Sequence, residues 1–497
     1  MTAQKKAGVA KSASKNHPAE VSPARKAAFH ILMAVERGQS HSDDLLRGKA
    51  VSTLSAPDRN LATALVLGVL RWQIQLDRQI CALLSRPNAK LDKEVLIALR
   101  LGAFQLLHMD RIPARAILSE SVELAKQAGL HFASGMVNAV LRKLVSRSQS
   151  VEKEIRSIKK RQGTTGRSGL QPRLPQMQQN EPRALAPEGS CSDDLEAHPA
   201  WMVERWTNFY GLDAARSICR HGQSQPVLTI RLANPTVESE LLQAGIHLDP
   251  GLLLTAARAV VSGDVTTFLD GRVRLQDEGS QLVAELASAT PSQKVKTILD
   301  CCAAPGGKTL ILAERNPEAR IVAMESSAPR LEQLQKRLAP HAARIECRLA
   351  DATALSEDSA FDLVLADVPC SGTGTLGRNP EIRHRLRPDG LARQTERQCA
   401  ILAAALRTLR PGGHVVYSTC SLEPEENEQV VATVRAIIPN ARLVSLAPRI
   451  DSLLDAKILS SIGAERLRAC LTPEGALRLL PGALHTDGFY ICMIERI

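Results

Sequence analysis

Short apolar runs alternate with longer helical segments from about residue 266 onwards, and this alternation constrains the fold more than any other feature of the chain. The runs lie at 295–300, 320–325, 361–367 and 413–418, and each has the length and the bounding residues of a buried strand. Strands that alternate with helices pair in parallel, because each helix crosses one face of the sheet before the next strand begins. Residues 266–497 are therefore predicted to form a doubly wound α/β domain with a parallel sheet.

Four further regions precede this domain. Residues 1–20 are basic and rich in small residues, and we expect them to be a disordered tail. Residues 21–147 place apolar side chains at intervals of three and four, which is typical of an all-α helical bundle. Residues 148–196 are rich in Gln, Pro, Arg, Ser and Gly without periodicity and predict a flexible linker. Residues 197–265 join a helical stretch to a strand-like run and predict a small mixed α/β domain.

The net positive charge of the chain lies in its N-terminal third. Residues 1–150 contain 22 Lys and Arg against 11 Asp and Glu, and this excess equals the +11 of the whole chain. Such asymmetry favours contact with a polyanion, of which nucleic acid is the commonest for a soluble protein. A solvated basic face without a partner is the alternative.

Composition excludes several other classes of protein. The chain is 44% hydrophobic and 23% charged, and no apolar stretch approaches the about 20 residues that span a bilayer. The N-terminus lacks the apolar centre of a secretory signal, so we expect a soluble cytoplasmic protein without membrane contact. The 11 cysteines contain no C-x-x-C spacing, which argues against a metal site and against a disulfide framework. Most should be reduced and inert, and a reactive one must be found from its context.

A glycine turn follows the first predicted strand, at CCAAPGGKT of 301–309. Glycines at the carboxyl end of a strand let a ligand approach the backbone, and the next helix offers unpaired N–H groups. A Walker A loop would need glycine where Cys302 stands, and the turn has no G-x-G-x-x-G, so a nucleoside without a triphosphate is favoured. Glu325 ends the second strand and is placed to bind ribose hydroxyls, while Asp351 is placed to reach an adenine amino group. S-adenosylmethionine fits this arrangement, although each acid alone is as typical of a helix cap or a solvated loop.

Two cysteines follow apolar runs, one in DVPCSGTG at 367–374 and one in YSTCS at 417–421. Carbon 5 of cytosine is a poor nucleophile, but a thiolate that adds to carbon 6 creates an electron-rich enamine at carbon 5. Asp367 would help the ring accept negative charge if burial raises its pKa, and a second thiol would help to expel the first. Chemistry alone does not decide whether Cys370 or Cys420 attacks, and an inert buried cysteine is the alternative for each.

The motifs CAAPGGKT, DVPCSGTG, YSTCS with EEN, and HTDGFY at 485–490 resemble, in this order, those of the RNA cytosine-5 methyltransferases. The resemblance implies a Rossmann-like domain that uses S-adenosylmethionine, with Cys420 as the nucleophile, Cys370 assisting product release and Asp367 in the catalytic centre. In DNA cytosine-5 methyltransferases the nucleophile follows proline in the earlier motif, which would be Cys370. The implied cofactor-binding residues are Cys302, Ala303, Ala304, Pro305, Gly306, Gly307, Lys308, Glu325, Asp351 and Asp367. Several family members have Asp in place of Glu325.

Residues 21–147 are similar to the NusB-like RNA-binding domain that is fused to the bacterial 16S ribosomal RNA methyltransferase B branch of this family. The similarity lies in ARKAA at 24–28, DRNLA at 58–62 and GMVNAVLR at 135–142. It implies methylation of an unstacked cytosine in 16S ribosomal RNA, held in part by the basic N-terminal domain. We expect a monomer without a metal. The alternatives are a transfer RNA cytosine-5 methyltransferase and a catalytically silent RNA-binding factor of ribosome assembly.

Overall fold

The computed structural model describes residues 20–86, 90–147, 195–288, 295–355 and 358–497. The chain forms two compact units, one within residues 1–175 and the other within 176–497. No helix among the described residues is long and apolar enough to cross a membrane. The expected tail and most of the expected linker lie outside the described residues, so both stay predictions.

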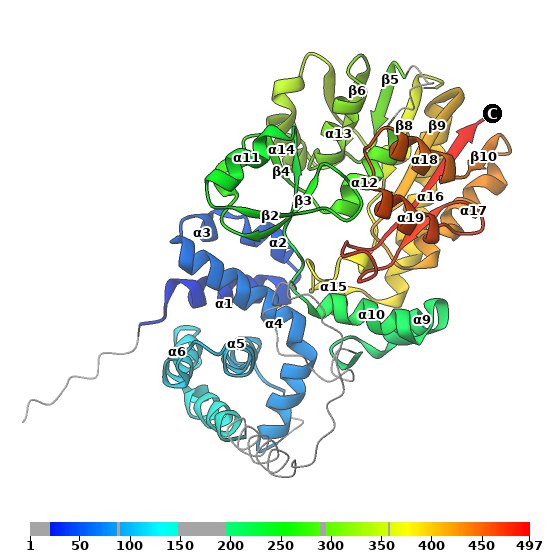
Figure 1. Cartoon of the computed structure of the whole chain (residues 1–497). Coiled ribbons are helices and arrows are strands. Elements are labelled where there is room, and N and C mark those ends of the chain that lie inside the picture. Colours follow the sequence, from blue (N-terminus) through cyan, green and yellow to red (C-terminus); the bar gives the residue numbers. More distant parts are fainter. Residues whose placement is uncertain (1–19, 87–89, 148–194, 289–294, 356–357) are drawn as a thin grey trace, which may run out of the picture. The chain divides into compact units, whose positions relative to one another are not determined.

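The first unit is all-α, as the spacing of its apolar residues predicted (Figure 1). A last helix begins at residue 134 and is described to residue 147. The helices bury one continuous apolar core, because each turns a stripe of apolar side chains towards the others. The other elements are α1 (Pro23–Glu36), α2 (Ser42–Leu46), α3 (Lys49–Ser52), α4 (Ala56–Leu83), α5 (Lys93–His108), α6 (Ala114–Gln127) and η1 (His131–Ala133).

Close packing of α4 on α5 depends on a glycine. A β-carbon on Gly68 of α4 would lie 2.0 Å from the ring carbon Cζ of Phe104 on α5. Gly102 of α5 is equally crowded, since its β-carbon would lie 2.7 Å from Cδ1 of Leu141. The two glycines therefore set how closely the helices approach, because side chains in a dense core cannot yield by this much.

The second unit is built on an eight-stranded sheet in the order β10-β12-β9-β8-β5-β6-β7, with β11 paired to β12. The strands β5 to β9 are parallel to one another, as their alternation with helices predicted. The chain builds one half of the sheet from β5 to β7, and after β7 it crosses back to place β8 on the other side of β5. The strands are β5 (Thr297–Asp300), β6 (Arg320–Glu325), β7 (Ile345–Leu349), β8 (Phe361–Asp367), β9 (Leu409–Thr419), β10 (Ala441–Val444), β11 (Leu477–Leu479) and β12 (Phe489–Arg496).

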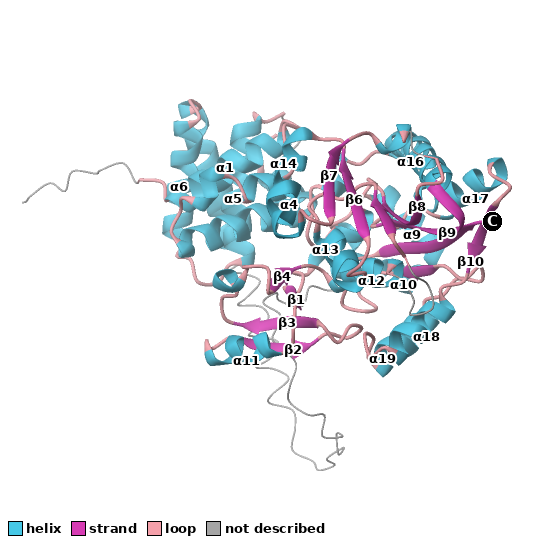
Figure 2. Ribbon diagram, turned by 90° about the horizontal axis from the view of Figure 1, so that it is seen from above, coloured by secondary structure: helices cyan, strands magenta, loops and turns pink. Residues whose placement is uncertain are grey.

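Helices cover both faces of this sheet (Figure 2). Leu363 and Leu365 of β8 pack into one apolar core, and Val364 and Ala366 pack into the other, because successive side chains of a strand point to opposite faces. This is why the strand reads as a continuous apolar run. One face is covered by α12 (Glu278–Ala287), α13 (Gly307–Arg315), α14 (Ala328–Leu338), α18 (Ala447–Asp455) and α19 (Ser461–Ala469), and the other by α16 (Pro388–Thr408) and α17 (Glu428–Ile437).

The sheet is not entirely parallel, in contrast to the sequence-based prediction. Strand β12 runs antiparallel to β9, with Tyr490 opposite Thr419, and β10 joins the sheet only through β12. The apolar run of β12 gave no sign of its direction, since a buried strand reads alike in either orientation. The carboxyl-terminal strand therefore enters the sheet beside the strand that leads to Cys420.

A second, four-stranded sheet has the order β2-β3-β1-β4 and is antiparallel throughout. It extends beyond residue 265, where the sequence predicted a boundary, because β4 pairs with β1. The helices α9 and α10 pack instead against Leu376 and Leu422 of the larger domain. These elements are α9 (Ala200–Tyr210), α10 (Leu212–Gln223), β1 (Thr229–Leu232), α11 (Thr236–Gln243), β2 (His247–Pro250), β3 (Ala257–Ser262), η2 (Thr266–Phe268) and β4 (Val273–Leu275).

The contact between α4 and α5 gives a testable prediction. Gly68→Ala should lower the free energy of unfolding of the first unit by about 1–3 kcal/mol, because the added methyl group overlaps the Phe104 ring. Gly135→Ala is the matched control, since nothing lies within 4 Å of its added methyl group and alanine favours a helix by about 1 kcal/mol. Native-state hydrogen exchange of α4 and α5 measures both changes. Equal stability of the two variants would contradict this account of the packing.

Candidate active site

The candidate site lies where β5, β8 and β9 end. The strand β5 has β6 on one side and β8 on the other, so the chain reverses its direction of winding at this point. Open α/β sheets bind ligands in the crevice that such a reversal leaves at the carboxyl ends of the strands. The glycine turn after β5 and the motifs after β8 and β9 are therefore brought to one edge, as the sequence predicted.

The glycine turn leaves no room for side chains. Gly306 has a φ of +93° and a β-carbon there would lie 2.9 Å from Cδ1 of Leu334, so only glycine fits this conformation. Helix α13 begins at the next residue, Gly307, whose β-carbon would lie 3.3 Å from the Gln276 side chain. The packing of Leu334 and Gln276 against the turn therefore favours glycine at both positions.

Asp300, the last residue of β5, lies buried beneath this turn. One carboxylate oxygen, Oδ2, accepts a hydrogen bond of 2.7 Å from the Thr309 hydroxyl, while Oδ1 is buried without a partner among the described residues. Burial raises the pKa of Asp300 to about 7, because the charged form loses its hydration. A buried acceptor of this kind is suited to a ligand group or an ordered water.

The two acids expected to bind the nucleoside lie at the ends of the next two strands. Glu325 is only 4% exposed, accepts a 2.9 Å hydrogen bond from the backbone N–H of Ser327 and lies 3.2 Å from Arg330. Asp351 is exposed and caps η4 (Ala352–Ala354), because its carboxylate accepts the backbone N–H of Thr353. That hydrogen bond is the main cause of the lowered pKa of Asp351.

Asp367 ends β8 and forms an ion pair. Lys308, on the first turn of α13, lies 2.7 Å from Oδ2 of Asp367, and the Ser418 hydroxyl donates to Oδ1 at 2.7 Å. The Asp367 side chain is 26% exposed, so the deep burial on which its proposed role as an acid was conditional is not found. Burial would lower the pKa of Lys308, but the attraction of Asp367 outweighs burial and raises it, with Cys420 adding to the effect.

The two cysteines meet at the ends of β8 and β9. The sulfur atoms of Cys370 and Cys420 lie 3.3 Å apart. The contact with Cys420, together with burial, raises the pKa of Cys370 well above its usual value. A thiol that keeps its proton is a weak nucleophile but can donate a hydrogen bond, and either sulfur can be the donor in this contact.

Glu426 joins the loops that carry the two cysteines, and sequence reasoning assigned it no role. It is fully buried, and its carboxyl group accepts the backbone N–H of Ser371 at 2.8 Å and the hydroxyls of Ser371 and Ser421. The side chain of Gln398 on α16 donates to the same carboxyl at 3.0 Å and to the Pro369 carbonyl at 2.9 Å. Glu426 belongs to the EEN that accompanies YSTCS in the family motifs, and this membership was the signal that could have drawn attention to it.

The remaining motifs are tied to the same edge by Arg378. Its guanidinium donates to Asp487 at 2.8 Å and to Asp277 at 2.9 Å, which joins HTDGFY to the segment before α12. The backbone N–H of Gly488 donates to the Gly374 carbonyl at 2.8 Å, and a β-carbon on Gly374 would lie 2.5 Å from the Gly488 oxygen. The close approach of these loops explains why both positions are glycine.

The residues of the crevice fit a nucleoside cofactor. The glycine turn leads directly into the N-terminus of α13, and Oδ1 of Asp300 and Oε1 of Gln276 are buried acceptors without a protein partner among the described residues. Glu325 adds a buried carboxylate at the end of the next strand. The fold and this site define a Rossmann-like α/β methyltransferase of the kind that uses S-adenosylmethionine.

Comparison with known proteins specifies the class further. Residues 288–495 match the family described as 16S rRNA methyltransferase RsmB/F, and residues 22–146 match the NusB family. A probable ribosomal RNA small subunit methyltransferase B of Bacillus subtilis is 31% identical over 95% of this chain and 98% of its own length. A protein of the same description from Synechocystis is 32% identical over 95% of this chain and 99% of its own. The chain belongs to the RsmB/F methyltransferase family and carries a NusB-family region at its N-terminal side.

A solved structure agrees with this assignment at the level of the fold. The crystal structure of PH0851 matches 96% of this chain and all of its own with a TM-score of 0.70 and 22% sequence identity. The all-α region, the small sheet and the methyltransferase domain expected from the sequence are thereby confirmed as the architecture.

The buried Asp300 predicts a dependence of stability on pH. Its pKa is higher in the folded chain than in the unfolded chain, so the folded state binds more protons and wild-type stability should fall as the pH rises from about 4 to about 7. Asp300→Asn removes this fall, and its stability relative to wild type should rise across that range. Urea unfolding, followed by hydrogen exchange of β5 and α13, measures the difference.

Asp362→Asn is the control, because the pKa of Asp362 is shifted in the opposite direction to that of Asp300. Although burial opposes it, the backbone N–H groups of Lys296 and Thr297 and the side chain of Arg410 lower the pKa of Asp362. Its contribution should be present above about pH 4 and be lost as the pH falls through the lowered pKa. A constant difference between Asp300→Asn and wild type at all pH values would contradict the raised pKa.

Proposed function

We propose that this protein transfers a methyl group from S-adenosylmethionine to carbon 5 of a cytosine in 16S ribosomal RNA through a covalent cysteine–RNA intermediate. The observation that carries the proposal is the contact between the Cys370 and Cys420 sulfurs, 3.3 Å apart, beside the ion pair of Lys308 with Asp367. Two adjacent thiols at the ligand-binding edge of this fold match a reaction in which one thiol attacks and the other assists its departure.

Cys420 is the proposed nucleophile. Its thiolate adds to carbon 6 of the cytosine ring, which places the electron pair of the former double bond in an enamine that ends at carbon 5. Lys308 lies within electrostatic reach of Cys420, since Cys420 contributes to the raised pKa of Lys308. Asp367, held by Lys308 and Ser418, is the proposed group that orients the pyrimidine edge while negative charge builds up in the ring.

The second half of the reaction regenerates the enzyme. After carbon 5 has been methylated, it loses its proton to a base, the double bond re-forms and the carbon–sulfur bond to Cys420 breaks. We assign to Cys370 the assistance of this release, because its protonated thiol lies next to the departing sulfur. The thiol can deliver its proton to the leaving thiolate and take one up from solvent.

The proposed cofactor residues are Cys302 to Lys308, Glu325, Asp351 and Asp367. When bound, S-adenosylmethionine supplies an electrophilic methyl group on a sulfonium. The glycine turn and the N-terminus of α13 would hold its amino-acid part, and Glu325 would hold the ribose hydroxyls. Asp351 has one oxygen engaged by Thr353, and its other oxygen is assigned to the adenine amino group.

The RNA substrate is inferred from two observations, the descriptions of the relatives and the charge of the NusB-family region. The relatives with which the chain aligns over nearly its whole length are described as small-subunit ribosomal RNA methyltransferases. The excess of 22 basic over 11 acidic residues within 1–150 coincides with the NusB-family region. A basic helical module in the same chain as the catalytic domain would provide the salt-dependent part of RNA affinity. A transfer RNA substrate and a silent assembly factor are the alternatives that the following test separates.

The two thiols have distinct predicted phenotypes. Cys420→Ala should reduce methyl transfer to deproteinised 16S RNA by at least about 10³-fold and give no covalent adduct, because the nucleophile is missing. Cys370→Ala should form an adduct that resists denaturation, because attack proceeds and release does not. Labelled S-adenosylmethionine and denaturing electrophoresis measure both signals, and Cys470→Ala, a half-buried thiol on another element, is the control.

Three results would contradict the proposal in different ways. An adduct retained by Cys420→Ala and lost by Cys370→Ala would exchange the two roles. Methylation of transfer RNA but not of 16S RNA by the wild type would replace the substrate. Binding of S-adenosylmethionine without transfer to any RNA, including an assembling small subunit, would favour the silent factor.

A further inference from the structure

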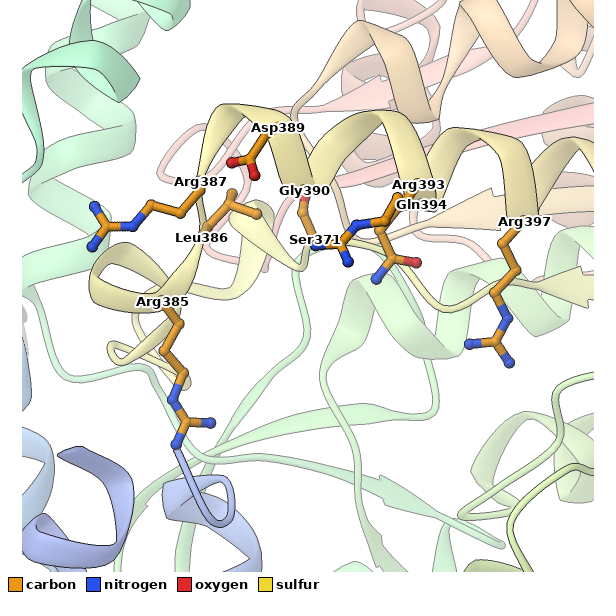
Figure 3. A pocket seen from close by; sticks show the side chains of 9 residues that line it. All are labelled: Ser371, Arg385, Leu386, Arg387, Asp389, Gly390, Arg393, Gln394 and Arg397. Carbon is orange, nitrogen blue, oxygen red and sulfur yellow. The ribbon is translucent and has the colours of Figure 1, made fainter. Parts of the chain in front are cut away.

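A cavity of about 430 Å³ lies beside the loop that carries Cys370, and Ser371 forms part of its wall. The rest of the wall comes from α15 (Ile382–Arg385), the turn after it and the first turns of α16 (Figure 3). Four arginines line the cavity against a single acidic residue, Asp389, so its lining is strongly positive. The arginines are Arg385, Arg387, Arg393 and Arg397.

The positive charges of these arginines are electrostatically unfavourable in the folded protein without a ligand. Within the described ranges, Arg387, Arg393 and Arg397 are exposed and none of them has an ion-pair partner. Arg393 and Arg397 are four residues apart on α16, where like charges repel. Arg387 is the N-cap of α16, where the helix dipole disfavours a positive charge. No described ion pair balances the charges of Arg387 and Arg393, and an anionic ligand would balance them.

Helix α16 links this cavity to the catalytic loops. Its Gln398, one turn beyond Gln394 in the cavity wall, donates to the Pro369 carbonyl and to the carboxyl of Glu426. The hydroxyl of Ser371 also binds Glu426 and lies 3.0 Å from the Ser421 hydroxyl. The wall of the cavity and the two thiols therefore belong to one hydrogen-bonded assembly.

We propose that this cavity binds the phosphodiester backbone of the substrate RNA beside the methylated cytosine, with Arg387 and Arg393 as its main phosphate ligands. The inference rests on the proposed function, because it assigns the cavity to the same RNA. A base that leaves its stack to meet a thiol must be held through its own strand, and phosphate contacts fix that register. Arginine suits the task because its planar guanidinium can bind two phosphate oxygens.

The charge of the cofactor disfavours it as the ligand of this cavity. S-adenosylmethionine has no phosphate, and its sulfonium and ammonium groups outweigh its one carboxylate, so the four arginines would repel the molecule as a whole. Arg397 lies at the cofactor side, since its charge contributes to the lowered pKa of Asp351. The test therefore leaves Arg397 unchanged and uses the two arginines whose only described role is to line the cavity.

The test compares Arg387→Gln/Arg393→Gln with Arg407→Gln/Arg466→Gln. The control pair removes the same charge from exposed positions of the same unit outside the cavity. Affinity for deproteinised 16S RNA is measured from about 50 to about 200 mM salt, and we expect the slope of log K against log salt to fall by about 0.7 for each cavity arginine removed. The KM for RNA should rise on the order of tenfold or more, with an unchanged dissociation constant for S-adenosylmethionine. The control pair should match wild type in KM.

Binding and turnover separate this inference from the proposed function. The salt slope needs no methyl transfer, so a wild type that binds RNA but methylates none would refute the proposed function and still test the cavity. Equal slopes and equal KM values in the cavity and control pairs would overturn the cavity assignment. Weakened binding of S-adenosylmethionine with unchanged RNA affinity would assign the arginines to the cofactor instead. Circular dichroism of the two double variants confirms that folding is retained.

Discussion

The buried carboxyl group of Glu426 is the interaction on which the catalytic centre depends. Glu426 does not react in the proposed mechanism. Its carboxyl group accepts hydrogen bonds from the loop after β8, the loop after β9 and α16. Because a buried carboxyl without partners is costly, the three segments must arrive together for any of them to be stable. The contact between Cys370 and Cys420 is a consequence of this arrangement, since each cysteine immediately precedes a serine that Glu426 binds.

The loop after Cys420 is also supported from outside the sheet. Arg205 and Trp206 of α9 bind the buried carboxylate of Glu423, and the Tyr210 hydroxyl donates to the Leu422 carbonyl. The first helices after the undescribed segment therefore belong functionally to the methyltransferase domain, although the sequence grouped them with the small sheet. Contacts with α9 and with α16 thus hold the catalytic loops in place. Precise positioning of the two thiols requires such rigid support.

The sequence predicted the features that depend on local pattern. Strands β5, β6, β8 and β9 were found because fully buried strands read as apolar runs, and the residues at their ends follow from parallel pairing. Features that depend on long-range contacts were not found. The antiparallel direction of β12 leaves no local trace, Glu426 looks like any acidic residue near a helix start, and the cavity arginines read as a solvated helix face. Asp367 was located correctly, but its pairing with Lys308 joins residues 59 positions apart.

The position of β12 in the sheet has a consequence for the order of folding. Strand β10 is synthesised before β12 but touches the sheet only through it, so residues 441–444 have no edge to join until residues 489–496 have paired with β9. The sheet is thus closed by a strand inserted between two earlier segments, and pairings of such long range are slow. Until that insertion, β9 presents an open edge on the side that leads to Cys420. The insertion of β12 therefore completes the sheet and also brings Asp487 and Gly488 against the loop after β8.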